Sequence, residues 1–455
     1  MIIHHEQQRA ELDQRIARNR KRLEEPYYQI DQVFQAPDAD WPGDKEGRAL
    51  LAFVSHYKMT GYINPCMEPM LAAMPTHTGP DLYFGPAAGD VIFEQQLSGH
   101  SWLLRGLCEH YEQFRDEFSL RALCAITEGL YLPTAGRYKG YPVDRDPKEL
   151  ATGGVSGHTT GNYEGWRLST DVGCAFMSID GLSHVYRITG DSRVKALLDE
   201  MIGVYTAIDK VALKAQTHCT LTAARGMLRM YRITGEPQYL TGAKDIFHLY
   251  VFGHGMDAVF QNLNWWGRPD TWTEPCAIVD SLMVAGELYR ITKKDMYRRC
   301  AARIYTNGLA SAQRPGGGAG TDSVVFPGEG DMAACDTLRL LTYEAPFCCT
   351  MRLAEGLWYA GENLNMLYYE TEQNRDGDMM VIHDGYGRYM CGDLVLGEPS
   401  LEAAEDSSPE DSSPEGWEVP APTVTVDGHG LHPLIPYYNL PDRVVGRLRQ
   451  RILFP

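Results

Sequence analysis

The sequence lacks long apolar runs and an excess of basic residues. No segment of its 455 residues approaches the roughly 18 apolar residues that cross a membrane. Lysine and arginine number 42 against 60 aspartates and glutamates, which gives a net charge of −18. Because nucleic-acid binding depends on clustered cations, this balance argues against a nucleic-acid partner. Hydrophobic residues make up 44% of the chain, so it can bury a large core.

The N-terminus also lacks the features of a secretory signal. MIIHHEQQRAELDQRIARNRKRLEE has no apolar centre and no small-residue cleavage site. The eleven cysteines are therefore expected to be free thiols in a reducing compartment, and the predicted location is cytoplasmic. Four of them fall inside apolar helical patterns and are expected to be small buried hydrophobes: Cys108, Cys124, Cys174 and Cys300.

The sequence does contain an internal repeat. HVYRITGDSRVKALL begins at His184, MLRMYRITGEPQYLTGAKDI at Met227 and ELYRITKKDMYRRCAARI at Glu287, and a degenerate copy begins at Leu107. Each copy joins the end of one amphipathic helix to the start of another, with Gly or Lys where a C-cap belongs. Helix pairs that recur every 45 to 75 residues or so favour a closed or superhelical array of helices.

The segments between these helices are long and rich in glycine, proline and aromatic residues. Examples are GPDLYFGPAAGD, ATGGVSGHTTGNYEGW, NLNWWGRPDTW and RPGGGAGTDSVVFPGEG. Long loops gathered at one end of a helical toroid would form the rim of a pocket. After about residue 364 the chain contains β-branched and alternating runs. We therefore predict a helical catalytic domain over 1–365 and a β-rich region over 366–455, which includes an acidic low-complexity loop at 401–419.

Four side chains are candidates for a metal site. TWTEPCAIVD places Glu274 and Cys276 two residues apart, and EAPFCCTMRL contains the adjacent pair Cys348 and Cys349. The paired Cys-x-x-Cys spacing of structural zinc sites is missing, but adjacent cysteines can both face one ion from a turn. Three thiolates and a carboxylate make a soft, tetrahedral environment that suits Zn²⁺, and buried free thiols are the alternative. Two sulfurs that share one zinc ion should lie within about 5 Å of each other.

These motifs resemble a known family when they are taken with three further segments in the same order along the chain. The segments are EQQLSGHSWLLRGLCEHY (94–111), IYTNGLASAQ (304–313) and PLIPYY near the C-terminus. Together they resemble glycoside hydrolase family 127, which includes the β-L-arabinofuranosidases. The resemblance implies a mainly α fold, an (α/α)6 barrel with a small C-terminal β-rich region. It also implies a retaining glycosidase with a zinc-bound cysteine nucleophile, acting on β-L-arabinofuranosides or a related unusual sugar.

The resemblance also implies roles for individual residues. Cys348 would be the nucleophile and Glu274 the general acid/base. The zinc ligands would be Cys276, Cys348 and Cys349, with Asp257 as the fourth.

Four residues are candidates for binding the carbohydrate substrate. His100 matches a sugar-contacting position of the family, and Gln216 or His218 corresponds loosely to another. His158 lies in a glycine-rich loop. Trp272 precedes Glu274, and aromatic faces stack on sugar rings.

The sequence departs from the family pattern at several positions. The fourth ligand of the family is a glutamate upstream of Glu274, but no glutamate occurs between residues 253 and 273, and Asp257 lies near the expected place. Thr350 follows the cysteine pair where a proline-containing turn is expected. A family histidine is replaced near Ala175. These departures bear on substrate specificity more than on the fold.

Two other classes of function compete with this hypothesis. One is a metal-free α/α-barrel hydrolase or lyase that uses carboxylates, Glu274 with Asp257 or Asp270. The other is a non-catalytic α/α repeat protein that binds carbohydrate. Zinc content separates the first hypothesis from both, and activity on glycosides separates the remaining two. No membrane partner is expected, and a homodimer is compatible with the sequence.

Overall fold

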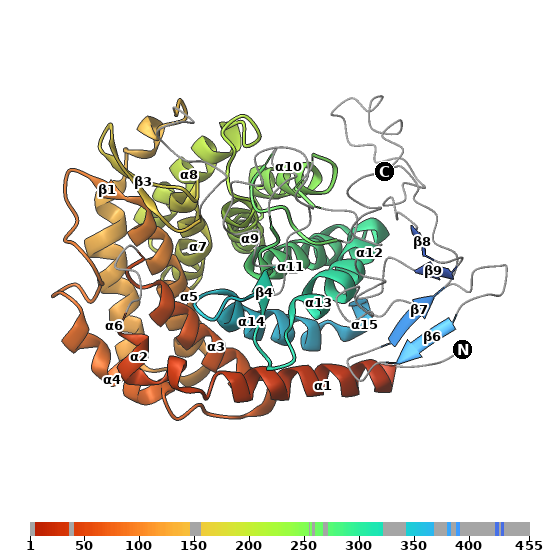
Figure 1. The fold of residues 1–455 in the computed structure, drawn as a ribbon. Helices are drawn as coiled ribbons and strands as arrows, with labels where there is room; N and C mark the ends of the chain where they lie inside the picture. The colour runs from red at the N-terminus through yellow and green to blue at the C-terminus, as the bar shows by residue number, and fades with distance from the viewer. Residues whose placement is uncertain are drawn as a thin grey trace.

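The computed structural model describes residues 5–35, 41–145, 156–253, 255–256, 260–266, 272–321 and 343–367, together with four short strands nearer the C-terminus. Helices dominate these residues (Figure 1). They are α1 (His5–Arg22), α2 (Ile30–Val33), α3 (Asp44–Thr60), α4 (Met67–His77), α5 (Glu94–Phe114), α6 (Glu117–Ile126), α7 (Ser178–Thr189), α8 (Ser192–Ala207), α9 (Thr217–Thr234), α10 (Pro237–Phe252), α11 (Pro275–Thr292), α12 (Asp295–Arg303), α13 (Ala310–Ala312), α14 (Cys349–Glu362) and α15 (Leu364–Leu367). No helix in the described part of the chain is long and apolar enough to cross a membrane.

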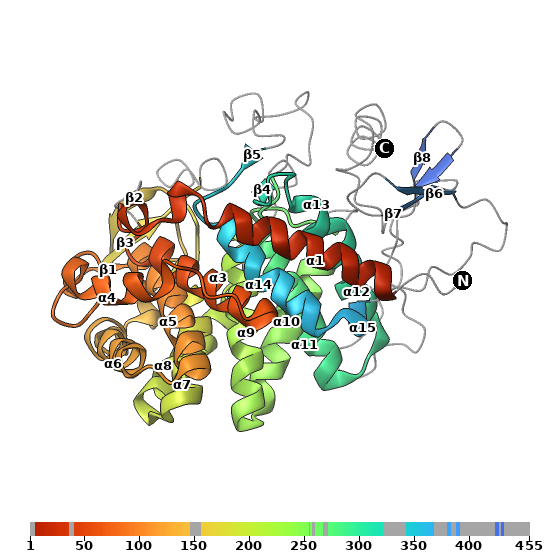
Figure 2. The ribbon, with the colours of Figure 1, turned by 90° about the horizontal axis from the view of Figure 1, so that it is seen from below.

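Six helices form a closed inner ring. α3, α5, α7, α9, α11 and α14 each pack against the next, and α14 packs against α3 to close the ring. An outer layer lies behind them: α6 packs on α5, α8 on α7, α10 on α9, α12 on α11, and α1 on α14. Figure 2 shows α1 lying along α14 on the outside of the ring. The fold is therefore a mainly helical (α/α) barrel, as predicted.

The sequence repeat corresponds to the inner-to-outer helix connections. The three clear copies join α7 to α8, α9 to α10 and α11 to α12, and the degenerate copy joins α5 to α6. Gly190, Gly235 and Lys293 end the inner helices in the left-handed conformation, with φ of 65°, 74° and 61°. Each backbone N–H donates to the carbonyl of the tyrosine four residues earlier. The predicted C-caps are confirmed.

The strands are few and short. They are β1 (Ile92–Phe93), β2 (Thr159–Tyr163), β3 (Trp166–Ser169), β4 (Gly320–Thr321), β5 (Tyr343–Glu344), β6 (Met380–His383), β7 (Arg388–Cys391), β8 (Val424–Val426) and β9 (His429–Leu431). β3 pairs with β1 in parallel and with β2 antiparallel, in a loop where the sequence predicted no strand. β4 pairs with β5.

The C-terminal strands fall in the region that the sequence predicted to be β-rich. β6, β7, β9 and β8 form one antiparallel sheet in that order. The first segment expected there, from residue 366, instead begins inside helix α15. The acidic loop at 401–419 lies outside the described residues, and the domain boundary at residue 365 stays a prediction.

The expectation that four cysteines are buried is correct for three of them. Cys108, Cys174 and Cys300 are fully buried, whereas Cys124 is exposed. Helix α6 buries Leu123 and Ile126 against the inner ring, and Cys124 projects from the opposite side. The buried face of α6 is therefore narrower than its apolar pattern predicts.

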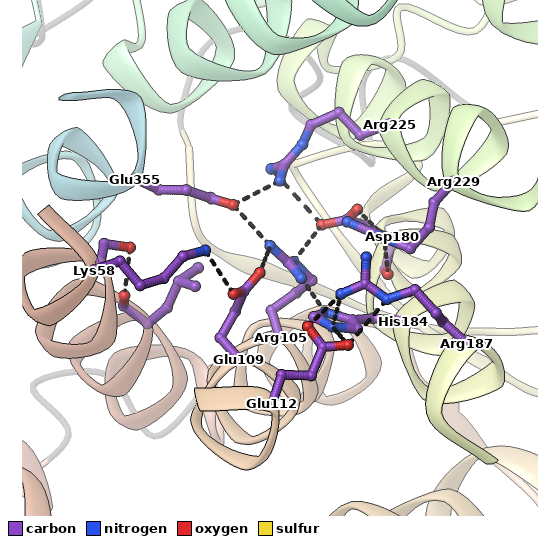
Figure 3. A network of polar contacts seen from close by, with 12 residues as sticks. Lys58, Arg105, Glu109, Glu112, Asp180, His184, Arg187, Arg225, Arg229 and Glu355 are labelled. Carbon is purple, nitrogen blue, oxygen red and sulfur yellow. Dashed lines mark hydrogen bonds and ion pairs between the residues drawn. The ribbon is translucent and has the colours of Figure 1, made fainter. Parts of the chain in front are cut away.

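Charged side chains fill the axis of the inner ring (Figure 3). Arg225 on α9 donates to Asp280 on α11 (2.7 Å) and to Glu355 on α14 (2.8 Å). Arg105 on α5 donates to Glu355 (2.8 Å) and lies 3.1 Å from Asp180 on α7. All five side chains are buried. Because an unpaired buried charge costs several kcal/mol, these ion pairs favour one arrangement of five inner helices.

Glu109, at the edge of this network, should make stability depend on acid pH. Burial raises the pKa of Glu109, but Arg105 and Lys58 outweigh it and lower the pKa to about 2. A carboxyl whose pKa is lower in the folded state stabilises the fold above the pKa it has when unfolded. That contribution is lost as the pH falls from about 4.5 towards 2. We therefore expect Glu109→Gln to lower the free energy of unfolding by about 3 kcal/mol at pH 7, at 1.36 kcal/mol per pKa unit.

Urea unfolding at a series of pH values tests this expectation, with Glu128→Gln as the matched control. Glu128 forms an exposed pair with Arg193 and should contribute less than about 1 kcal/mol. The stability of Glu109→Gln should fall less steeply below pH 4.5 than that of the unmodified protein. Parallel pH profiles for the two proteins would contradict the assignment.

Candidate metal centre

Two inner helices begin beside each other and carry the candidate ligands. Glu274 is the N-cap residue of α11, which begins at Pro275, and Cys348 is the N-cap residue of α14, which begins at Cys349. Proline suits the first helical position because its fixed φ is already helical. The positive ends of both helix dipoles therefore lie at the cluster, where they favour thiolate and carboxylate.

The four predicted side chains form one cluster. Glu274, Cys276, Cys348 and Cys349 each offer a ligand atom, and these atoms all lie within 4.8 Å of one another. The sulfur of Cys349 is 3.7 Å from that of Cys276 and 3.3 Å from that of Cys348. Cys276 and Cys349 are buried, and Cys348 is partly exposed. The predicted limit of about 5 Å between the sulfurs of Cys276 and Cys348 is met.

The geometry of the cluster fits a zinc ion. Two thiolates on a tetrahedral ion lie about 3.8 Å apart when each Zn–S bond is about 2.3 Å. The observed separations of 3.7 and 3.3 Å are close to that value. The adjacent cysteines can face one point because the backbone turns at Cys348, with φ −119° and ψ −57°, as α14 begins. The group can therefore hold a metal ion with three sulfur ligands and one oxygen ligand.

The thiols differ in how readily they lose a proton. Hydrogen bonds from Cys276 and Cys349, with the nearby guanidinium of Arg48, lower the pKa of Cys348 to about 5. Burial raises the pKa of Cys276 to about 11 and the pKa of Cys349 above its usual range. The most acidic thiol is therefore the partly exposed one. That combination suits a nucleophile.

Glu274 is held by groups on two sides. Its Oε1 lies 2.9 Å from Nδ1 of His218, and its Oε2 accepts from Nε2 of Gln216 at 3.3 Å. Burial alone would lower the pKa of His218, but the carboxylates of Glu274 and Asp280 outweigh it and raise the pKa to about 10. His218 is therefore an imidazolium whose other nitrogen lies 3.4 Å from Asp280. The structure places His218 in the same site as Glu274.

The sequence did not identify the residues that surround the cluster. The guanidinium groups of Arg48 and Arg352 lie over the indole of Trp102, at 4.2 and 4.4 Å from a ring centroid. The ring of His218 stacks on the same indole at 5.7 Å. Arg48 also donates to Asp44 (2.6 Å) and to the sulfur of Cys276 (3.4 Å). Arginines on the apolar face of a helix were the signal that could have revealed them, because buried cations need partners.

Asp171 is a second carboxyl near the site that the sequence did not identify. It follows β3 and is buried, and its Oδ1 accepts from Ser156 (2.8 Å). Burial and the charge of Glu274 raise the pKa of Asp171 to about 7, against the opposing hydrogen bonds from Ser156 and from the backbone of Gly157. A carboxyl with this pKa can give or take a proton near neutral pH.

His100 has a structural role. Its ring is fully buried, Nδ1 lies 2.7 Å from the carbonyl of Gln96, and Nε2 accepts from the backbone N–H of Phe84 at 2.9 Å. Burial lowers the pKa of His100 to about 4, so the ring is neutral. Both nitrogens are occupied by backbone groups, which leaves no polar atom of His100 for a sugar.

Of the four remaining predicted residues, the structure describes His158 and Trp272. His158 is exposed, just before β2. Trp272 is buried and packs edge-to-face on Trp265, with ring centroids 4.9 Å apart. Asp257 and the alternative carboxylate Asp270 lie outside the described residues. Asp257 as a zinc ligand stays a prediction, and among the described residues the carboxylate that groups with the three sulfurs is that of Glu274.

Comparison with known proteins supports the fold. No protein-family model matches the chain, and no curated protein matches it. The solved structure of a GH127 β-arabinofuranosidase is similar over 83% of this chain, with a TM-score of 0.51 and 12% identity. This chain spans 62% of the length of that protein. At this identity the likeness shows a shared (α/α)-barrel fold.

Two further solved structures are similar at lower scores. One is described as a glycoside hydrolase, with a TM-score of 0.48, 12% identity and coverage of 82% of this chain and 70% of that one. The other is a cellobiose 2-epimerase from Bacillus thermoamylovorans, with a TM-score of 0.45, 13% identity and coverage of 71% and 88%. Membership of one glycoside hydrolase family stays a prediction.

The cluster predicts a metal content that can be measured. We expect about one zinc ion per chain in protein purified without chelators, as determined by plasma mass spectrometry. Cys276→Ser should lose the metal and lower the unfolding temperature, because ligation contributes to folding. The matched control is Cys124→Ser, which changes an exposed cysteine outside the cluster and should leave both values unchanged. Zinc-free wild-type protein from zinc-supplemented medium would contradict the assignment.

Proposed function

We propose that this protein is a retaining glycoside hydrolase that uses a cysteine nucleophile. The observation that carries the proposal is the cluster of three cysteines and one glutamate at the N-terminal ends of inner helices in an (α/α) barrel. The likeness of the fold to a β-arabinofuranosidase structure is compatible with a carbohydrate substrate. We infer β-L-arabinofuranosides, or a related unusual sugar, as the substrate class.

Cys348 is the residue that we expect to react with the sugar. It is partly exposed, and its low thiol pKa makes the thiolate available at neutral pH. The thiolate would attack the anomeric carbon as the bond to the leaving oxygen breaks, which forms a sulfur–carbon bond. Water would then attack the same carbon and release the thiolate, so the configuration is retained after two displacements.

We assign Glu274 to the metal together with the three cysteines. A bound Zn²⁺ would keep the thiols deprotonated at neutral pH. Both oxygens of Glu274 already act as acceptors, from His218 and Gln216, which suits a carboxylate ligand better than a proton donor. This proposal departs from the acid/base role that the family resemblance implies for Glu274.

The proton for the leaving oxygen would then come from another group. We infer Asp171, because its carboxyl is buried near Glu274 and its pKa of about 7 leaves it partly protonated at neutral pH. In the first displacement it would protonate the leaving oxygen, and in the second it would take a proton from water.

Replacement of the nucleophile tests the proposed reaction. Cys348→Ser should reduce kcat on the best glycoside of a nitrophenyl glycoside panel by at least about a thousandfold, because the hydroxyl is a much weaker nucleophile. The fold should persist, as measured by circular dichroism. Undiminished turnover in Cys348→Ser would favour a carboxylate-based hydrolase. No turnover by the wild type on any furanoside or pyranoside would favour a carbohydrate-binding protein.

Replacement of Asp171 tests the proton donor. Asp171→Asn should lower kcat on natural-type glycosides by roughly a hundredfold or more, the contribution typical of general acid catalysis. The rate of the first displacement on nitrophenyl glycosides should be unchanged in Asp171→Asn, because nitrophenolate leaves without being protonated. Zinc content should be unchanged, in contrast to Glu274→Gln, which should lose the metal. If Glu274→Gln keeps zinc and shows the leaving-group dependence instead, Glu274 is the acid/base.

A further inference from the structure

A cavity lies at the end of the barrel opposite the cysteine cluster. It has a volume of about 240 Å³ and lies among the C-terminal halves of α5, α7, α9, α11 and α14. Its walls contain six arginines and three glutamates. The arginines are Arg105, Arg187, Arg225, Arg229, Arg232 and Arg290. A wall so rich in cations is unusual in a chain whose net charge is −18.

The repeat in the sequence supplies half of these arginines. Arg187, Arg232 and Arg290 are the arginine of the three Tyr-Arg-Ile-Thr copies. Each lies in the last turn of its inner helix, so the ring geometry brings equivalent positions to one cavity. Part of their charge is used within the protein: Arg187 donates to both oxygens of Glu112 (3.0 and 2.5 Å), and Arg232 and Arg290 both pair with Glu287 (3.0 Å each). Cations near helix C-termini also balance the helix dipoles.

Arg229 has donors that no described residue accepts. Its Nη1 lies within 2.8 Å of a carboxylate oxygen and the carbonyl of Asp180 and the hydroxyl of Ser183. Its Nε and Nη2 form no hydrogen bond with the residues that the structure describes. The side chain is only 14% exposed, and it belongs to the cavity wall. These two nitrogens are open to solvent in the cavity, where the oxygens of a bound ligand can accept from them.

Burial and neighbouring cations both act on the titratable groups at this end of the barrel. Burial lowers the pKa of Arg229 to about 10, and the charges of Arg105 and Arg187 act in the same direction, although Asp180 opposes them. Burial and three arginines also hold the pKa of His184 well below its usual value. Figure 3 shows Arg105, Arg187 and Arg229 close together around Asp180 and His184. Asp180 and Glu112 pair with Arg229 and Arg187, so the cations and carboxylates of this end form one network.

We propose that this cavity binds a phosphate-type oxyanion, either free phosphate or the phosphoryl group of a sugar phosphate. Guanidinium groups present paired N–H donors that match the oxygens of a tetrahedral oxyanion. The unused nitrogens of Arg229 would contact the anion, and Arg187 and Arg232 at the rim would add charge. The site lies at the opposite end of the inner helices from the cysteine cluster and does not depend on the glycosidase proposal.

Calorimetric titration of the full chain with inorganic phosphate and with glucose 6-phosphate tests the proposal. Ionic strength should be held constant with sodium chloride, so that general screening is equal in every titration. We expect saturable binding of one anion per chain, and Arg229→Gln should weaken it at least about tenfold because two charge-assisted donors are lost. Tighter binding of glucose 6-phosphate would identify a sugar phosphate as the ligand, and equal binding would identify the free anion.

Two further variants complete the test. Arg229 also neutralises Asp180, so Arg229→Gln could unfold; Arg232→Gln changes a half-exposed rim residue and should still weaken binding several-fold. Arg193→Gln, on the exposed face of α8, is the matched control and should bind like the wild type. No binding above that of chloride, or equal binding by wild type, Arg232→Gln and Arg193→Gln, would overturn the proposal.

Discussion

The carboxylate of Asp280, fully buried on the axis of the barrel, is the group on which the surrounding structure most depends. It accepts from Arg225 at 2.7 Å and from Arg352 at 2.6 Å, and it lies 3.4 Å from Nε2 of His218. Burial would raise the pKa of Asp280, but its cationic neighbours outweigh it and hold the pKa below its usual range. Loss of either arginine would leave this fully buried carboxylate with less compensation, so the ion pairs favour one arrangement of helices α9, α11 and α14.

The candidate site is built on that arrangement. His218 lies between Asp280 and Glu274, and its positive charge fixes the orientation of the glutamate at the mouth of the cluster. Arg352 and Arg48 lie on the indole of Trp102, and Arg48 reaches the sulfur of Cys276. The ligand atoms are thus supported by buried side chains on inner helices and not by loops alone. A site on rigid elements keeps its geometry with less loss of conformational entropy on binding.

The two ends of the barrel carry different side chains for a common reason. The inner helices run in the same direction, so their N-termini gather at one end and their C-termini at the other. The positive ends of the dipoles favour the thiolates and Glu274, and the negative ends favour the repeated arginines. The repeat therefore produces two chemically different ends from one recurring helix pair.

Local periodicity and capping residues were enough to predict the helix pairs and their C-caps. The residue types alone made Glu274, Cys276, Cys348 and Cys349 candidates for one site, with buried free thiols as the alternative, and the family resemblance favoured the site. The sequence did not reveal Arg48, Trp102 or Asp171, and it suggested a sugar contact for His100. These outcomes depend on which buried groups meet across the ring. The ring nitrogens of His100 bond to two backbone groups, whereas those of His218 lie beside two carboxylates. Such pairings form only when the helices pack, since a buried polar group depends on the partner that another helix supplies.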